Sequence, residues 1–138
     1  MKEELIVEAV VDNLEIVNDF VHRFISQYQC SKRTVMQLDL IIEEIFVNIA
    51  SYAYAPDTGS AKILLEIDPE PLKVTLTFVD TGIPYNPLIN SDPDITLAAE
   101  DRQIGGLGIF LTKKLVNDIS YRYEDGQNIL RFTKSLTD

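Results

Sequence analysis

The sequence predicts an α+β fold, a two-layer α/β sandwich in which helices cover one face of a mixed, mainly antiparallel sheet. Segments with strand character come in consecutive pairs joined by short turns, which favours hairpins over a doubly wound parallel sheet. Two long segments carry apolar residues at helical spacing. The composition, 46% hydrophobic and 25% charged residues, is typical of a globular domain with a substantial core. We therefore expect residues 1–138 to form a single domain.

The first half of the chain predicts one strand and two helices. Residues 5–11 are rich in Val, Leu and Ile, and the Asp-Asn pair at 12–13 follows them, which indicates a strand leading into a capped helix. Apolar residues then recur every three or four positions as far as about Tyr28, so this helix should pack on the sheet. Ser31 can cap a second helix, which keeps the helical period until the Tyr-Ala-Tyr-Ala-Pro sequence at 52–56.

The second half predicts two hairpins separated by a long loop and a helix. Residues 82–108 contain three of the six prolines and four of the six glycines, and they show little sustained periodicity. A loop of this length in a compact domain usually serves a function, so a site is expected there. The elements expected around it are strands at 61–67 and 72–79, a helix at 109–116, and closing strands at 119–124 and 129–136 that flank the turn Asp125-Gly126.

Charge and cysteine content exclude several classes of protein. Twelve Lys and Arg against 22 Asp and Glu give a net charge of −10, and no segment has more than two adjacent basic residues, which argues against nucleic acid or an anionic membrane as partner. Cys30 is the only cysteine and His22 the only histidine, so neither an intrachain disulfide nor a Cys/His zinc site is expected. The apolar run at 5–11 is too short for a signal or a membrane span. We expect a cytoplasmic protein.

The first motif that carries chemistry is a carboxylate and an amide on the second predicted helix. Glu44 and Asn48 are four residues apart, so their side chains project from the same helix face and converge. Considered alone, the pair is more simply interpreted as a solvated glutamate with a hydrogen-bonding neighbour.

The second motif, Asp-Thr-Gly-Ile-Pro-Tyr-Asn-Pro at 80–87, follows a predicted strand. A carboxylate that leaves a buried strand edge can accept a hydrogen bond from an exocyclic amine, and Gly82 lets the backbone turn closely past a flat ligand. An Asx-type turn that ends the strand at Asp80 is the alternative, because Asp-x-Gly occurs in many loops.

The third motif, Ile-Gly-Gly-Leu-Gly-Ile-Phe-Leu at 104–111, is a glycine-rich turn that opens a helix. Exposed backbone N–H groups and the positive end of the helix dipole form a phosphate site that needs no basic side chain. A flexible hinge with a cap is the alternative. The motif is not a Walker loop, because no Gly-Lys-Ser or Gly-Lys-Thr follows, and it lacks the strand and βαβ unit of the dinucleotide fingerprint.

In their order along the chain, the three motifs resemble those of the Bergerat, or GHKL, ATP-binding fold, and the resemblance covers about residues 5–135. Glu44 to Asn48 resembles its N-box, Asp80 to Pro84 its G1 box, residues 88–104 its ATP lid and Gly105 to Gly108 its G2 box. Within this superfamily the chain is similar to the small bacterial anti-sigma-factor serine/threonine-protein kinases. The likeness rests on the Asp-x-Gly-x-Pro-Tyr-Asn-Pro form of the G1 box and on the Gly-Gly-Leu-Gly-Ile-Phe-Leu-x-Lys-Lys-Leu continuation after the lid.

The resemblance implies a role for each motif residue. Glu44 would be the general base that orients or deprotonates the attacking hydroxyl, and Asn48 would be the protein ligand of Mg²⁺. Asp80 would accept a hydrogen bond from the adenine amino group of ATP, and Gly82 would leave room beside the base. The phosphates would be held by the backbone of Gly105, Gly106, Leu107 and Gly108.

The chain also departs from the family pattern. Pro84 replaces the second glycine of the common Asp-x-Gly-x-Gly form, and Tyr52 stands where relatives often have a basic residue or histidine. Arg102 is the only basic residue of the lid. The last hairpin lacks an unambiguous Gly-Thr to place beside the adenine, so Gln127 and Asn128 receive no role.

The function implied by the resemblance is that of an ATP- and Mg²⁺-dependent protein serine/threonine kinase, an anti-sigma regulatory factor that phosphorylates an anti-sigma-factor antagonist. Its other partners would be a sigma factor, held in an alternative complex, and a second copy of the chain in a homodimer. A regulatory module that binds ATP without phosphotransfer is the alternative, followed by a plain ATPase. The net charge of −10 disfavours a broad polyanion but agrees with a small anion held by Mg²⁺ and backbone N–H groups.

Overall fold

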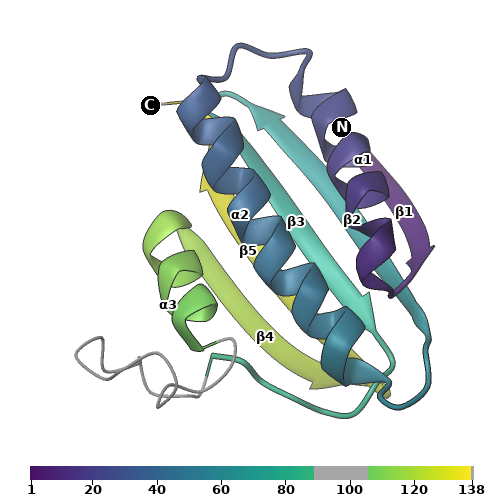
Figure 1. Cartoon of the computed structure of the whole chain (residues 1–138). Helices are drawn as coiled ribbons and strands as arrows, with labels where there is room; N and C mark the ends of the chain where they lie inside the picture. Colours follow the sequence, from purple (N-terminus) through teal and green to yellow (C-terminus); the bar gives the residue numbers. More distant parts are fainter. Residues whose placement is uncertain (89–105, 138) are drawn as a thin grey trace.

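A sheet forms one layer of the protein and helices form the other, as Figure 1 shows. The computed structural model describes residues 1–88 and 106–137, and within these ranges the five strands follow the order β1-β2-β3-β5-β4 with every pairing antiparallel. The strands are β1 (Lys2–Glu8), β2 (Ser60–Pro69), β3 (Leu72–Asp80), β4 (Asp118–Glu124) and β5 (Gln127–Ser135). The helices are α1 (Leu14–Ile25), α2 (Lys32–Asn48) and α3 (Gly106–Leu115), with a 3-10 turn η1 (Val11–Asn13) and a π-helical turn η2 (Ile49–Ala53). The two-layer sandwich predicted from the sequence is confirmed, but the sheet of the described residues is antiparallel throughout and not mixed.

The pleat of the sheet turns alternate residues of the central strands toward the helices. The buried apolar residues of this face are Ala61, Ile63, Leu65 and Ile67 on β2, Val74, Leu76 and Phe78 on β3, and Leu130 and Phe132 on β5. Asp80 and Asn128 continue the same alternation and are paired with each other in the β3–β5 register. Two polar residues therefore lie on the helix-covered face, at the end where β3 stops and β5 begins.

The first two helices bury their apolar stripes against this face. The residues concerned are Val17, Phe20, Val21 and Ile25 on α1, and Leu38, Ile41, Ile42, Ile45 and Phe46 on α2. Ser31 caps α2 as predicted, because its Oγ accepts a hydrogen bond from the backbone N of Thr34 at 3.1 Å. Within the described residues, no helix is long and apolar enough to cross a membrane.

The predicted side-chain cap of α1 is wrong. Asn13 stands at the cap position, but its side chain makes no hydrogen bond to the helix. Its Nδ2 donates instead to the carbonyl oxygen of Glu8 at 2.8 Å, so the amide ties the turn back to the end of β1. The 3-10 turn η1 provides the entry to the helix in place of a cap.

Several element boundaries differ from the sequence prediction. The helix expected to reach about Tyr28 ends at Ile25. The strand expected at 5–11 begins earlier, at Lys2, and ends at Glu8, although Ala9 still donates its N–H to Gly59 O at 2.7 Å. Ala9 is buried, whereas Val11 is 52% exposed, so the apolar run beyond the strand contributes only its first residue to the core. The second helix ends at Asn48 and continues as η2, while α3 begins at Gly106, inside the segment expected to be a loop.

Candidate functional site

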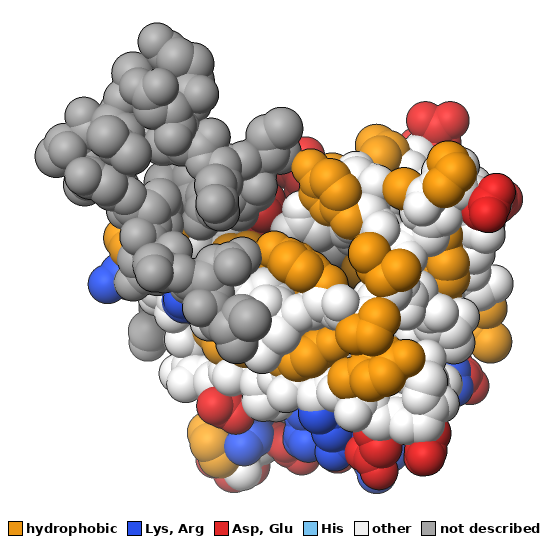
Figure 2. All heavy atoms as spheres, turned by 90° about the horizontal axis from the view of Figure 1, so that it is seen from below, with side chains coloured by type: hydrophobic (Ala, Val, Ile, Leu, Met, Phe, Trp, Pro, Cys, Tyr) orange, Lys and Arg blue, Asp and Glu red, His pale blue; other side chains and the backbone are white. Residues whose placement is uncertain are grey.

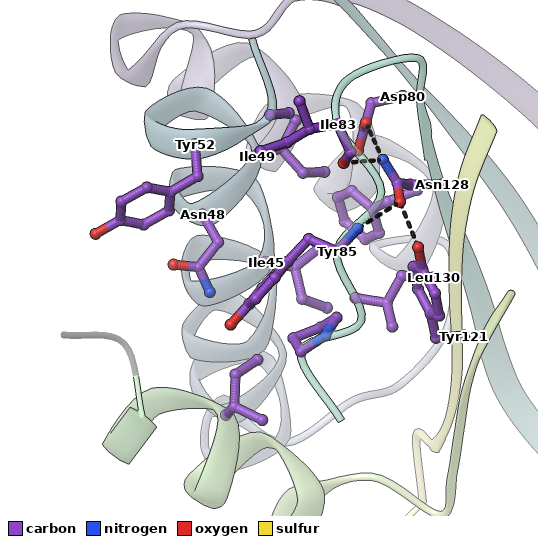
Figure 3. A pocket seen from close by; sticks show the side chains of 14 residues that line it. Ile45, Asn48, Ile49, Tyr52, Asp80, Ile83, Tyr85, Tyr121, Asn128 and Leu130 are labelled. Carbon is purple, nitrogen blue, oxygen red and sulfur yellow. Dashed lines mark hydrogen bonds between the residues drawn. The ribbon is translucent and has the colours of Figure 1, made fainter. Parts of the chain in front are cut away.

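A cavity of about 410 Å³ lies where α2 and β3 end and α3 and β5 begin, and Figure 3 shows the side chains that line it. Its apolar and aromatic lining consists of Ile45, Ile49, Tyr52, Ala53, Phe78, Ile83, Tyr85, Pro87, Ile109, Tyr121 and Leu130, and its amide and carboxylate groups are Asn48, Asp80 and Asn128. The view from this end shows hydrophobic side chains gathered together, with many charged side chains toward the margins (Figure 2). An apolar cavity with a few fixed polar groups suits a flat ligand that carries a small number of hydrogen-bonding atoms.

Asp80 is the carboxylate of this cavity, and only 6% of the residue is exposed. Its Oδ1 accepts two hydrogen bonds, from the backbone N of Gly82 at 2.9 Å and from Asn128 Nδ2 at 2.8 Å. The Asx-type turn that the sequence left as an alternative is therefore present. Because both bonds converge on one oxygen, the other oxygen of the carboxylate remains for a ligand.

Gly82 lies against the π-helical turn η2. A Cβ atom at this position would stand 2.2 Å from the carbonyl oxygen of Ala53, and the same oxygen accepts a hydrogen bond from Ile83 N at 2.9 Å. Tyr54 adds a second tie, since its hydroxyl accepts from Thr81 N at 2.8 Å. The end of α2 and the segment after β3 are thus held together, and a glycine is needed where their backbones meet.

Glu44 and Asn48 converge on one face of α2, as their spacing predicts. Asn48 Nδ2 donates to Glu44 Oε1 at 3.1 Å, which leaves the amide oxygen of Asn48 available beside the cavity that this residue lines. Burial raises the pKa of the Glu44 carboxyl, and the neighbouring charge of Glu43 raises it further, whereas the hydrogen bond from Asn48 lowers it. A carboxylate with a raised pKa is a better proton acceptor than an exposed one.

The glycine-rich turn meets this pair at the first turn of α3. Gly106 and Leu107 begin the helix, and a Cβ atom at Gly108 would stand 2.0 Å from the carboxyl carbon of Glu44. The backbone of the first helical turn therefore lies directly against the carboxylate. Gly105 lies outside the described residues, and so does the expected lid after Leu88, which includes Arg102.

Comparison with known proteins agrees with this arrangement. Residues 7–134, nearly the whole chain, match the sequence model of the histidine kinase-like ATPase domain. The chain belongs to this family. Membership implies that the domain binds ATP, which agrees with an apolar cavity that borders a helix N-terminus.

The relatives of this ATPase domain include protein kinases. The serine/threonine-protein kinase BtrW of Bordetella bronchiseptica is 32% identical over 103 residues, which are 75% of this chain and 72% of BtrW. The serine-protein kinase RsbW of Bacillus cereus is 24% identical over 98 residues, which are 70% of this chain and 61% of RsbW. A crystal structure of the RsbU and RsbW domains of a Mycobacterium tuberculosis protein covers 100% of this chain and 33% of that one, with a TM-score of 0.70 and 12% identity, so it shares the fold.

Asn128, which received no role in the sequence analysis, is a buried polar residue of the cavity lining. It is 7% exposed and bonds to Asp80, to Ile83 O at 2.9 Å, to Tyr85 N at 3.1 Å and to the Tyr121 hydroxyl. The sequence did contain one signal for this residue. Asn128 follows the Asp-Gly turn by two residues and lies on the same strand face as Leu130 and Phe132, so an amide occupies a position where the alternation predicts an apolar residue. Its partner Asp80 lies 48 residues earlier, and the sequence does not specify that pairing.

Tyr52 also lines the cavity, from the turn η2. It occupies the position at which the resemblance leads one to expect a basic residue, and it is 45% exposed. Figure 3 shows its ring beside Asn48, on the α2 side of the cavity. An aromatic hydroxyl at this position offers hydrogen bonding without positive charge.

Proposed function

We propose that this ATPase domain is an ATP- and Mg²⁺-dependent protein serine/threonine kinase that acts as an anti-sigma regulatory factor and phosphorylates an anti-sigma-factor antagonist. The observation that carries the proposal is the contact of Glu44 with Gly108, because it joins a carboxylate of raised pKa to the helix start at which phosphates bind. Similarity to the kinases BtrW and RsbW supports the reaction type.

The adenine of ATP would occupy the apolar cavity. The oxygen of Asp80 that neither Gly82 nor Asn128 uses would accept a hydrogen bond from the exocyclic amine. Aliphatic side chains such as Ile49 and Ile83, both part of the lining, would contact the faces of the ring. The specificity for adenine would then come from one charged acceptor in apolar surroundings.

The phosphates would lie at the N-terminal end of α3. The first N–H groups of a helix have no acceptor within the helix, so those of Gly106, Leu107 and Gly108 would bind phosphate oxygens. Gly105 would extend the same site. This binding needs no cluster of Lys or Arg, which reconciles a triphosphate ligand with a net charge of −10.

The residues present also suit Mg²⁺. Asn48 Oδ1 is a hard oxygen ligand, and no group of three or more His, Cys, Asp or Glu gathers within residues 1–88 and 106–137, so the remaining ligands would come from phosphates and water. When bound, the ion would neutralise charge on the phosphates. Asn48 is itself oriented by its bond to Glu44, which links the metal ligand to the base.

Phosphotransfer would then follow from the position of Glu44. Its carboxylate would take the proton from a serine or threonine hydroxyl of the antagonist as that oxygen bonds to the γ-phosphorus. The bond from the γ-phosphorus to the bridging oxygen breaks at the same time, and ADP leaves with the electron pair. The antagonist would be the phosphoacceptor, a sigma factor the partner of the alternative complex, and the active form a homodimer in the cytoplasm.

The test is phosphotransfer from radiolabelled Mg-ATP to an antagonist encoded beside the gene for this chain. The intact chain should label the antagonist, and Glu44→Ala should reduce labelling by about 100-fold or more. Glu15→Ala is the control, because Glu15 is an exposed glutamate on α1 and is not among the residues that line the cavity. Equal labelling by Glu44→Ala would overturn the role of the base. Tight ATP binding without transfer to any protein would favour the alternative, a regulatory module.

A further inference from the structure

Every hydrogen-bonding group of the Asn128 side chain is engaged by the protein. Nδ2 donates to Asp80 Oδ1 at 2.8 Å and to Ile83 O at 2.9 Å, while Oδ1 accepts from Tyr85 N at 3.1 Å and from the Tyr121 hydroxyl (Figure 3). A side-chain amide has two donor hydrogens and two acceptor lone pairs, so this set is complete. Asn128 therefore has no group left for a ligand and acts on one only through the residues it holds.

These bonds fix which way the amide faces. Two donors point at its oxygen, and its nitrogen faces three acceptors, since Gly82 O also lies within 3.4 Å. A rotation of the amide by 180° would place donor against donor and acceptor against acceptor. Burial raises the pKa of the Tyr121 phenol, and the charge of Asp80 raises it further, against a lowering by a backbone bond at Tyr85. The phenol keeps its proton at neutral pH and remains a donor to Asn128.

The fixed amide engages one of the two carboxylate oxygens of Asp80, a residue that lines the cavity. Asn128 Nδ2 and Gly82 N both bind Oδ1, so the carboxylate is held at two points and Oδ2 is the atom left for a ligand. A carboxylate oxygen accepts hydrogen bonds and repels other acceptors. Oδ2 therefore favours a base with an amino group and disfavours one with a carbonyl at the same position.

Asn128 also holds the wall opposite α2. Ile83 and Tyr85, which it binds through their backbone, belong to the segment after β3 and both line the cavity. The amide of Asn128 thus sets the distance between the Asp80 carboxylate and the segment that contains Ile83 and Tyr85. A bound base must hydrogen-bond to the carboxylate and pack against this segment at the same time, which narrows the range of bases that fit.

We infer that Asn128, supported by Tyr121, is the positioning residue that makes the cavity select a purine bearing a 6-amino group. The inference rests on the proposed function, since it takes the base of ATP as the ligand. The inference adds Asn128, from the last hairpin, to the adenine site. Asn128 would act on the base by holding Asp80 and would not contact the base itself.

The test compares Mg-ATP with Mg-purine riboside triphosphate, which lacks the 6-amino group, by titration calorimetry. The intact chain should bind ATP about tenfold or more tightly than the analogue, as expected for a hydrogen bond to a charged group. Asn128→Leu keeps the branched shape of the side chain and removes all of its hydrogen bonds. It should reduce the ratio to about twofold or less, while the affinity for the analogue changes by less than about threefold. Gln127→Ala is the matched control and should leave the ratio unchanged.

The ratio distinguishes positioning from support of the fold. If Asn128→Leu weakens both nucleotides by the same factor, the ratio is unchanged and the inference is overturned. Tyr121→Phe removes one donor and keeps the ring, so it decides the matter if Asn128→Leu does not fold. It should lower the ratio about two- to threefold, and an unchanged ratio overturns the inference. If the intact chain binds neither nucleotide, the proposed function itself fails, and this inference fails with it.

Discussion

Gly108 lies so close to Glu44 that a Cβ atom on the glycine would stand 2.0 Å from the carboxyl carbon. The two residues belong to α3 and α2 and are 64 positions apart in the sequence. The Glu44 carboxylate can therefore occupy this position only because residue 108 of α3 has no side chain. A single methyl group on Gly108 would displace this carboxylate.

Gly108→Ala should reduce activity more than stability. The clashing atoms are the far end of a flexible glutamate, which can swing aside, and alanine favours the helix by about 0.5–1 kcal/mol over glycine. A displaced base should lower phosphotransfer about 10- to 100-fold, while the free energy of unfolding changes by less than about 1 kcal/mol. Activity assays and urea unfolding measure the two effects. A large loss of stability with unchanged activity would contradict this explanation.

Gly82→Ala should have the opposite profile, because the atom it meets belongs to the backbone. A Cβ atom there would stand 2.2 Å from Ala53 O, and that oxygen is held by its bond from Ile83 N. We expect a loss of about 1–3 kcal/mol in the free energy of unfolding, measured in urea, together with weaker nucleotide binding. Thr58→Ala, an exposed position in the neighbouring turn, is the control and should unfold like the intact chain.

Local patterns were enough to predict most of the fold. Apolar residues at helical spacing give α1 and α2, and a separation of four residues brings Glu44 and Asn48 together, since both depend only on the geometry of one helix. The order of motifs correctly indicated the family. The boundaries were less accurate: β1 ends at Glu8 because its partner β2 begins at Ser60, a limit that residues 5–11 do not encode.

Contacts between distant segments could not be derived in the same way. The pairing of Asp80 with Asn128 requires β5 to insert beside β3, and hairpin signals alone place β5 only against β4. The approach of Gly108 to Glu44 likewise depends on how α3 packs on α2. The motif glycines Gly82 and Gly108 therefore indicated that another group lies close to the backbone, but they did not indicate which atom that would be.

Tyr54→Phe tests the tie between the end of α2 and the segment after β3. The Tyr54 hydroxyl donates to Ser60 O at 2.6 Å and accepts from Thr81 N at 2.8 Å. Its loss should lower the free energy of unfolding by about 1 kcal/mol, because water can reach the groups left unpaired. Tyr123→Phe is the matched control, since that ring is 46% exposed. Equal unfolding curves for the two variants would show that the tie contributes nothing.

Glu44→Gln should stabilise the folded protein at neutral pH while it abolishes phosphotransfer. Burial raises the pKa of Glu44 in the folded state, so the folded protein keeps this proton to a higher pH than the unfolded chain does. Stability contributed by the protonated carboxyl is present below the unfolded pKa and is lost as pH rises through the folded pKa. Glutamine does not ionise, so it avoids this loss.

The measurement is the thermal unfolding midpoint of Glu44→Gln and of the intact chain across pH 4 to 8. The midpoint of the variant minus that of the intact chain should rise from pH 4, through the range above the ordinary glutamate pKa of 4.5, and then level off. Glu15→Gln, at an exposed position of α1, is the control and should show no such rise. Phosphotransfer by the intact chain should increase over the same pH range, because the base must be ionised to accept a proton. If the difference in midpoint stays constant with pH, the pKa of Glu44 is the same in the folded and the unfolded protein. The argument that a raised pKa makes Glu44 a better proton acceptor would then fail.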